Sequence, residues 1–169
     1  MMFVAGTAFA QDYATKGLLE FGVSEQYGDV ITNLVPEVHY FVADNISLGG
    51  QLNNFATKTG NVERTGTEIL LNPRYVANIE SENIYPFGGL LLGISKDTYE
   101  NTNTNYKDET SITKFGVEAG IKIKVTESGM LNFGLRYLTS SGTEKVTGFT
   151  DVDSDASNLN LRIGFTFYK

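Results

Sequence analysis

The chain contains no cysteine and no tryptophan, and it has one histidine and three prolines among its 169 residues. Without cysteine, neither a disulfide nor a thiolate metal site can form. The net charge of −7 disfavours nucleic acid as a partner, because its phosphates would be repelled. No apolar run approaches the roughly 18 residues that a membrane-spanning helix needs. A membrane protein with this sequence could therefore only be a closed β-barrel.

The residues that are abundant favour short strands joined by turns. The chain has 18 glycines, and its aromatic residues are all Phe and Tyr. Residues 1–10 are apolar and small, and they end in Ala8-Phe9-Ala10 before Gln11, which resembles a secretory signal with its cleavage site. A basic segment in front is missing. We therefore interpret residues 1–10 as a truncated signal-peptide remnant, with an N-terminal strand as the alternative, and residues 11–169 as one domain.

The clearest alternation of apolar and polar residues lies at residues 112–125. Successive side chains of a strand point to opposite faces. One face then holds Thr113, Phe115, Val117, Ala119, Ile121, Ile123 and Val125. The other face carries four charges and two glycines, and it holds Ile112, Lys114, Gly116, Glu118, Gly120, Lys122 and Lys124.

The same alternation predicts seven more strands, each about ten residues long, which is the length that a tilted strand needs to cross a bilayer. They are residues 16–25, 34–42, 46–55, 68–75, 85–95, 131–137 and 159–168. Three connections are short and centre near Asp44, Ser81 and Glu127. Four are predicted to be long polar loops, at residues 26–33, 57–66, 97–110 and 141–157. Short turns at one end and long loops at the other are typical of an outer-membrane barrel.

One strand register satisfies both faces of the hairpin across Glu127. It places Glu118 opposite Arg136 and Lys122 opposite Asn132, while apolar residues meet on the other face. The same exercise at the turn near Asp44 places Glu37 beside Gln51 and His39 beside Gly49.

Charged residues of both signs recur on the polar faces of the predicted strands. Because an isolated buried charge is costly, a packed interior needs nearly matched partners. We predict an interior charge network of Glu20, Glu37, Arg74, Lys114, Glu118, Lys122, Arg136 and Arg162. The apolar faces, including Leu90, Leu92 and Ile94, would then point outward. Four aromatic residues near strand ends could form interfacial girdles or pack as ordinary sheet residues: Tyr40, Tyr75, Tyr137 and Phe167. The alternative is a solvated charged face with the apolar residues around a shared interior.

Two prolines, Pro36 and Pro73, fall inside predicted strands. A closed barrel has no free edge for a residue without an N–H group, so bulges are the places where we expect them.

No residue pattern indicates catalysis, a cofactor or a metal. A barrel enzyme acting on lipid would need a histidine with serine and a carboxylate near the outer rim, whereas His39 lies near the short turn at Asp44. Asp151, Asp153 and Asp155 resemble the start of a calcium loop. The sixth and twelfth positions are alanine and arginine where glycine and glutamate are required, so we expect an ordinary acidic loop.

Several stretches resemble a known family. Residues 36–49, read as PEVHYFVADNISLG, look like the second hairpin of small bacterial outer-membrane β-barrel proteins of the OmpA/OmpX type. Residues 72–75 and 85–89 look like the next hairpin. Residues 159–168 are similar to the C-terminal aromatic strand that the barrel-assembly machinery recognises, although Lys169 follows where the family usually stops. The resemblance implies outer-membrane lipid and lipopolysaccharide as surroundings and the assembly machinery as a partner.

The sequence thus predicts an all-β, eight-stranded, antiparallel up-and-down transmembrane barrel in the outer membrane of a Gram-negative bacterium. We expect a monomeric, non-enzymatic protein with a charge-filled interior. Its periplasmic turns would be short, and its polar loops would serve adhesion, defence or envelope integrity at the cell surface. A soluble lipocalin-like barrel for an apolar ligand is the alternative, followed by a lipid-modifying barrel enzyme.

Overall fold

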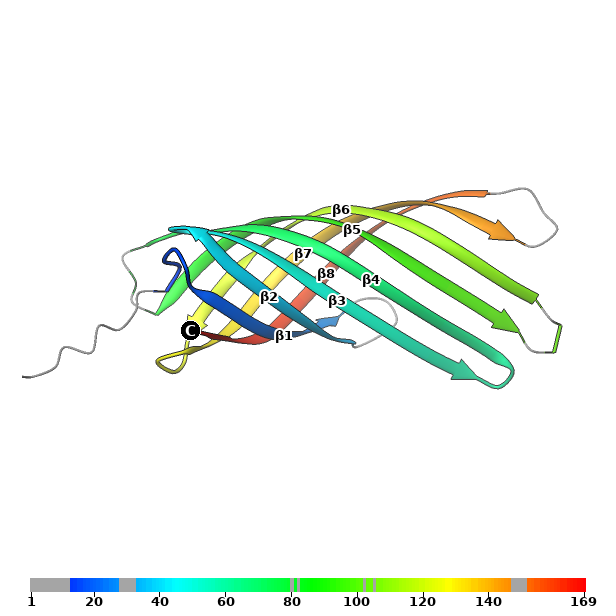
Figure 1. The fold of residues 1–169 in the computed structure, drawn as a ribbon, viewed down its shortest axis with the longest axis horizontal. Coiled ribbons are helices and arrows are strands. Elements are labelled where there is room, and N and C mark those ends of the chain that lie inside the picture. The colour runs from blue at the N-terminus through cyan, green and yellow to red at the C-terminus, as the bar shows by residue number, and fades with distance from the viewer. Residues whose placement is uncertain are drawn as a thin grey trace, which may run out of the picture.

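The computed structural model describes residues 13–27, 33–79, 81, 83–101, 103–104, 106–146 and 152–169. These residues form a closed barrel of eight antiparallel strands in chain order, with the last strand paired to the first (Figure 1). The strands are β1 (Leu19–Tyr27), β2 (Asn33–Ala43), β3 (Ile46–Thr59), β4 (Val62–Val76), β5 (Ile84–Asn101), β6 (Tyr106–Lys124), β7 (Gly129–Val146) and β8 (Val152–Tyr168). The predicted fold class is confirmed. The signal remnant predicted at residues 1–10 lies outside the described residues. No helix of the described part is long and apolar enough to cross a membrane.

The expected registers are confirmed in both hairpins. Glu118 lies opposite Arg136 and Lys122 opposite Asn132 in the β6–β7 pair. Residues 37 and 51, and residues 39 and 49, are partners in the β2–β3 pair, where the register shifts only between Phe41 and Ala43.

Most large apolar side chains in the middle of the strands point away from the barrel axis, and the charged ones there point into it. Phe115 and Leu161 are 52% and 46% exposed, whereas Glu118 and Arg136 are 5% and 2% exposed. The outward direction of Leu90, Leu92 and Ile94 is confirmed. Tyr40, Tyr75, Tyr137 and Phe167 are also exposed on the outer surface. A soluble barrel with its apolar residues around an inner ligand site is therefore excluded. We call the outward apolar surface the belt.

The strands are longer than predicted, so the expected loops at 57–66, 97–110 and 141–157 are wrong. β3 and β4 are joined by a tight turn at Gly60 and Asn61, where Gly60 has a φ of 61° that favours glycine. β5 and β6 run to Asn101 and from Tyr106, and β7 and β8 run to Val146 and from Val152. Apolar and polar residues alternate only in the parts of the strands that form the belt, so the alternation does not show where the strands end. Polar Thr, Ser and Asn residues beyond it continue the ladder, because each paired residue adds backbone hydrogen bonds.

Four hairpins have their turns at the same end of the barrel, and of these β1–β2 is shorter than β3–β4, β5–β6 and β7–β8. Its connection is also shorter than the predicted loop 26–33, because Gln26 pairs with Asn33. The β2–β3 pairing ends at Glu37 with Gln51, and the β1–β8 pairing ends at Tyr27 with Leu161. Strands β3 to β8 therefore continue past β1 and β2, as Figure 1 shows. We call the parts of β3 to β8 that lie beyond the belt the rim.

The two strand prolines are not at bulges, so that expectation is wrong. Pro36 pairs in register with Val23, at the end of the β2–β3 ladder. Pro73 interrupts the β4–β5 ladder without a register shift, since the pairs at 72–91 and 73–90 are missing between two pairs of the same register. The side-chain amide of Asn72 donates to the Leu90 carbonyl at 2.8 Å and replaces the N–H that proline lacks.

We expect Asn72→Ala to destabilise the barrel by about 1–3 kcal/mol, because it leaves a buried carbonyl without a donor. In that background, Pro73→Ala should recover part of the loss by supplying a backbone N–H. The measurement is urea unfolding in detergent followed by far-UV circular dichroism, since the chain has no tryptophan to report on unfolding. Equal stability of the single and double variants would count against this role for Asn72.

Candidate functional site

The end of the barrel with the β2–β3, β4–β5 and β6–β7 turns, where short turns were predicted, is closed by residues 13–18, which we call the plug. Leu18 and Gly17 exchange backbone hydrogen bonds with Phe41: the Gly17 N–H donates to the Phe41 carbonyl at 2.8 Å, and the Phe41 N–H donates to the Leu18 carbonyl at 2.9 Å. Ala14 and Gly17 have positive φ values of 68° and 91°, which turn the chain back on itself before β1 begins. Tyr13, at the start of the plug, packs against the rings of Phe41 on β2, Tyr85 on β5 and Tyr168 on β8, so the plug lies across the mouth of the barrel.

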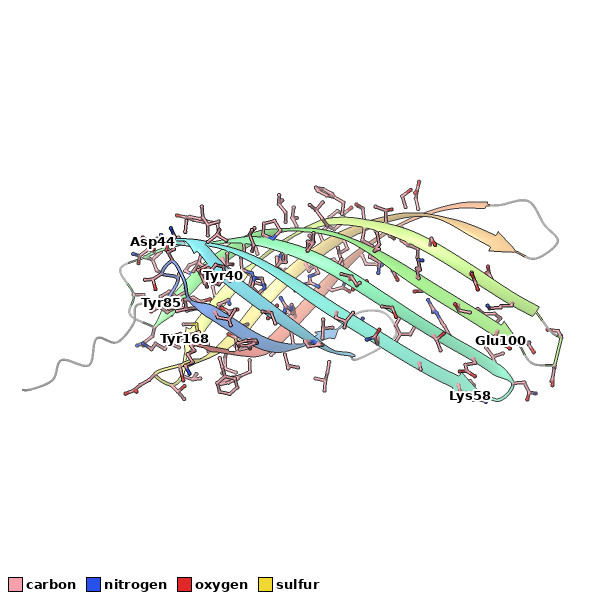
Figure 2. All side chains as sticks on the ribbon, in the orientation of Figure 1. Tyr40, Asp44, Lys58, Tyr85, Glu100 and Tyr168 are labelled. Carbon is pink, nitrogen blue, oxygen red and sulfur yellow. The ribbon has the colours of Figure 1, made fainter. Side chains whose placement is uncertain are left out.

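Tyr13 is the aromatic side chain of the plug, and it is buried at the mouth of the barrel together with Leu18. Its ring lies 4.9 Å from the ring of Tyr85 and 5.2 Å from that of Tyr168, centroid to centroid. Figure 2 shows Tyr85 and Tyr168 near Asp44, at the opposite end from Lys58 and Glu100. Burial, and then the Glu20 carboxylate, raises the pKa of Tyr13 well above its usual value, and the neutral hydroxyl donates a hydrogen bond to Glu20.

Seven of the eight predicted interior residues lie in one buried ion network next to the plug. Arg74 contacts all three carboxylates: Nη2 lies 2.8 Å from Glu118 and 3.5 Å from Glu37, and Nη1 lies 3.6 Å from Glu20. Arg162 contacts Glu37 and Glu118, and Lys122 contacts Glu20.

Glu118 is the carboxylate with the most arginine partners. Oε1 accepts from Arg74 Nε at 2.9 Å, and Oε2 accepts from Arg136 Nη2 at 3.0 Å and Arg162 Nη1 at 3.4 Å. The strand pairing alone would give it only Arg136. The network holds four cations against three carboxylates, with His39 counted as neutral, so one positive charge is in excess.

The eighth predicted residue, Lys114, lies outside this network and pairs with Glu68 nearer the rim. Between the two groups, the next inward residue on four strands is apolar and at most 7% exposed. This layer consists of Val35, Leu70, Leu91 and Leu138. The ion network is thus closed off on one side by Tyr13 of the plug with the rings of Phe41, Tyr85 and Tyr168, and on the other side by the aliphatic layer.

Sequence reasoning missed Glu68 and Tyr13. Glu68 has the same strand parity as Arg74, so the alternation could have found it. Tyr13 precedes the first strand, and nothing in a period-two pattern shows that the chain there folds back into the barrel.

A serine, the histidine and a glutamate stand in line inside the network. Ser47 Oγ lies 3.4 Å from His39 Nδ1, and His39 Nε2 lies 3.5 Å from Glu37 Oε2. These residue types could activate a nucleophile. Ser47 is 1% exposed, however, and both sides of the network are closed, so a substrate has no access to it. The arrangement is that of a packed interior.

The described residues hold no group of three His, Cys, Asp or Glu side chains that could bind a metal. The acidic motif that resembles a calcium loop cannot be placed, because Asp151 lies outside the described residues and nothing is described of the Asp153 side chain.

We expect Glu118→Gln to cost about 3–5 kcal/mol of stability, because Arg136 then has no carboxylate partner and Arg74 and Arg162 each lose one of theirs. Arg136→Met should cost less than half as much, since Glu118 keeps two arginines and the excess charge disappears. Glu68→Gln is the matched control and should cost about 0–1 kcal/mol, because Lys114 is partly exposed. Urea titrations of the three variants in the same detergent measure the order, and equal losses would contradict it.

No protein-family model and no curated protein matches this chain. Solved structures do match its fold. OprG of Pseudomonas aeruginosa aligns with a TM-score of 0.67 at 14% identity, covering 92% of this chain and 97% of its own. The N-terminal β-barrel domain of OprF, from the same organism, aligns with a TM-score of 0.63 at 14% identity, covering 91% and 98%. Ail, the attachment invasion locus protein of Yersinia pestis, aligns with a TM-score of 0.51 at 11% identity, covering 92% and 100%. At these identities the likeness is one of fold, that of the small eight-stranded outer-membrane barrels.

Proposed function

We propose, with this barrel fold as the premise, that the protein is an integral outer-membrane barrel that presents its rim at the bacterial cell surface for binding, as an adhesin does. The belt would lie in the bilayer, the short turns and the plug would face the periplasm, and the rim would extend outside. The observation that carries this proposal is the continuation of β3 to β8 as paired strands past the belt. A paired rim holds its outward residues in fixed positions, which suits recognition better than free loops do.

The outward residues of the rim are polar and carry both signs of charge. Lys58 pairs with Glu63 at 3.9 Å, and Lys107 pairs with Glu109 at 2.6 Å. Ail, one of the structural neighbours, is by name an attachment protein. That name supports adhesion over defence or envelope integrity as the role to test first, in an assay of bacterial binding to host cells or matrix with and without the protein.

Insertion of a short epitope tag tests the orientation. A tag between Gly60 and Asn61, in the β3–β4 turn, should be bound by antibody on intact cells. A matched tag between Ser128 and Gly129, in the β6–β7 turn, should be bound only after permeabilisation. The reverse pattern, or protection of both tags, would contradict the proposed topology, and heat-modifiable migration on a detergent gel checks that both variants fold.

A second expectation is that the barrel does not conduct. The plug, the ion network and the aliphatic layer fill a lumen that is narrow in any eight-stranded barrel. Planar bilayer recordings should therefore show no steady open channel. Large sustained single-channel currents would rule out a closed interior and favour transport.

An enzymatic role for Ser47, His39 and Glu37 can be tested separately. The folded protein should not react with a fluorophosphonate probe, because the serine is enclosed. Labelling that is lost in Ser47→Ala would revive the proposal of a lipid-modifying enzyme.

A further inference from the structure

A hollow of about 480 Å³ lies on the outer wall where the belt ends on β3, β4 and β5. Six outward residues form it in two rows of strand partners, with Phe55 and Gly66 beneath. The rows are Asn54, Thr67 and Lys96, followed toward the rim by Ala56, Thr65 and Thr98. The next row toward the short turns is apolar and exposed, and it consists of Leu52, Ile69 and Ile94. In a membrane, this hollow would lie at the level of the lipid head groups.

Hydrogen-bond donors predominate in the hollow. The Thr67 hydroxyl donates to Asn54 Oδ1 at 2.9 Å, which leaves the Asn54 side-chain NH₂ directed to other acceptors. Lys96 supplies a cation, and no lining residue is acidic. The neighbouring Asp97 points inward and binds Arg64 at 3.1 Å. Outward acids do lie nearby: Glu109 is the strand partner of Thr98 and pairs with Lys107 at 2.6 Å. Glu63 and Glu100 form part of the next row toward the rim, where Glu63 pairs with Lys58 at 3.9 Å. Charge and donors together match an anion that also carries hydroxyl groups.

A second hollow of similar size, about 420 Å³, lies at the belt edge of β6, β7 and β8. It also has a floor of small hydroxyl residues, but its one charged residue is Asp155. Its lining is Thr113, Phe115, Thr139, Ser140, Ser141, Asp155, Ala156 and Ser157. The two hollows are similar in size and both lie at the edge of the belt, but their charged residues have opposite signs, so the second is an internal control for the first.

We propose that the Lys96 hollow binds the phosphate of an outer-leaflet glycolipid, with the Asn54 amide and the Thr65 and Thr98 hydroxyls contacting the sugar. Lys96 lies where a lipid phosphate would be, and the belt directly below would contact the acyl chains. This proposal rests on the proposed outer-membrane location, because only there does the hollow meet such a lipid.

Native mass spectrometry of the folded barrel in neutral detergent tests the proposal. The probes are an acylated glucosamine disaccharide with two phosphates and the same lipid without phosphate. The phosphorylated lipid should bind roughly tenfold more tightly, as one ion pair allows. Lys96→Gln should remove this preference. Lys58→Gln, which removes another exposed rim lysine, should keep it. Asp155→Lys should add a second binding site with the same preference.

Equal binding of the two lipids by a heat-modifiable, folded barrel would overturn the site while leaving the proposed function intact. Equal losses in Lys96→Gln and Lys58→Gln would show diffuse attraction to the rim and would also overturn it. Failure of the protein to fractionate with the outer membrane would instead count against the proposed function, since the lipid assay uses purified protein and does not depend on location.

Discussion

The contact between Arg74 and Glu118 is the interaction on which the rest of the interior depends. Arg74 lies on β4 and Glu118 on β6, and through their shared partners they connect to carboxylates on β1 and β2 and to arginines on β7 and β8. Because a buried charge is costly without partners of opposite sign, this network favours one register. A slip of one residue in any of these strands would turn its charged residue toward the belt and an apolar residue into the lumen. The ion network therefore specifies which way six of the strands face, namely β1, β2, β4, β6, β7 and β8.

Room for this network comes from residues without side chains. Gly120 and Gly134 are strand partners on the inner wall, and a Cβ on Gly120 would come within 2.8 Å of the Phe87 ring. The ring occupies the space that the glycines leave, and its face receives Arg74 at 4.7 Å and Lys122 at 5.8 Å. Such cation–π contacts stabilise ammonium and guanidinium groups away from water. The glycine pair thus explains how a lumen this narrow holds an aromatic ring beside long cationic side chains.

The sequence predicts those parts of the structure in which apolar and polar side chains alternate along a strand. Alternation was enough to predict the direction of Phe115 and Glu118 and the β6–β7 register, because lipid outside and charge inside impose opposite preferences on neighbouring residues. The ends of β5 and β7 were not predictable in this way, since polar residues beyond the belt meet water on both faces. The sequence also could not predict that Lys114 pairs with Glu68 outside the network, or that Glu118 contacts three arginines. Which charges meet across the lumen depends on barrel tilt and closure, whereas strand pairing reports only neighbours along the wall.

A membrane barrel cannot rely on its belt for closure, because lipid is as apolar as the side chains that it touches. Closure must be favoured by backbone hydrogen bonds and by the interior. If Ser47, His39 and Glu37 had a catalytic task, they would need an opening through the plug or the aliphatic layer, and water entering there would weaken the ion pairs on which the register depends. The need for a closed interior thus explains why binding residues are expected on the rim. Side chains that hold the wall together are enclosed, and the residues left free to meet other molecules are those on the outer surface beyond the belt.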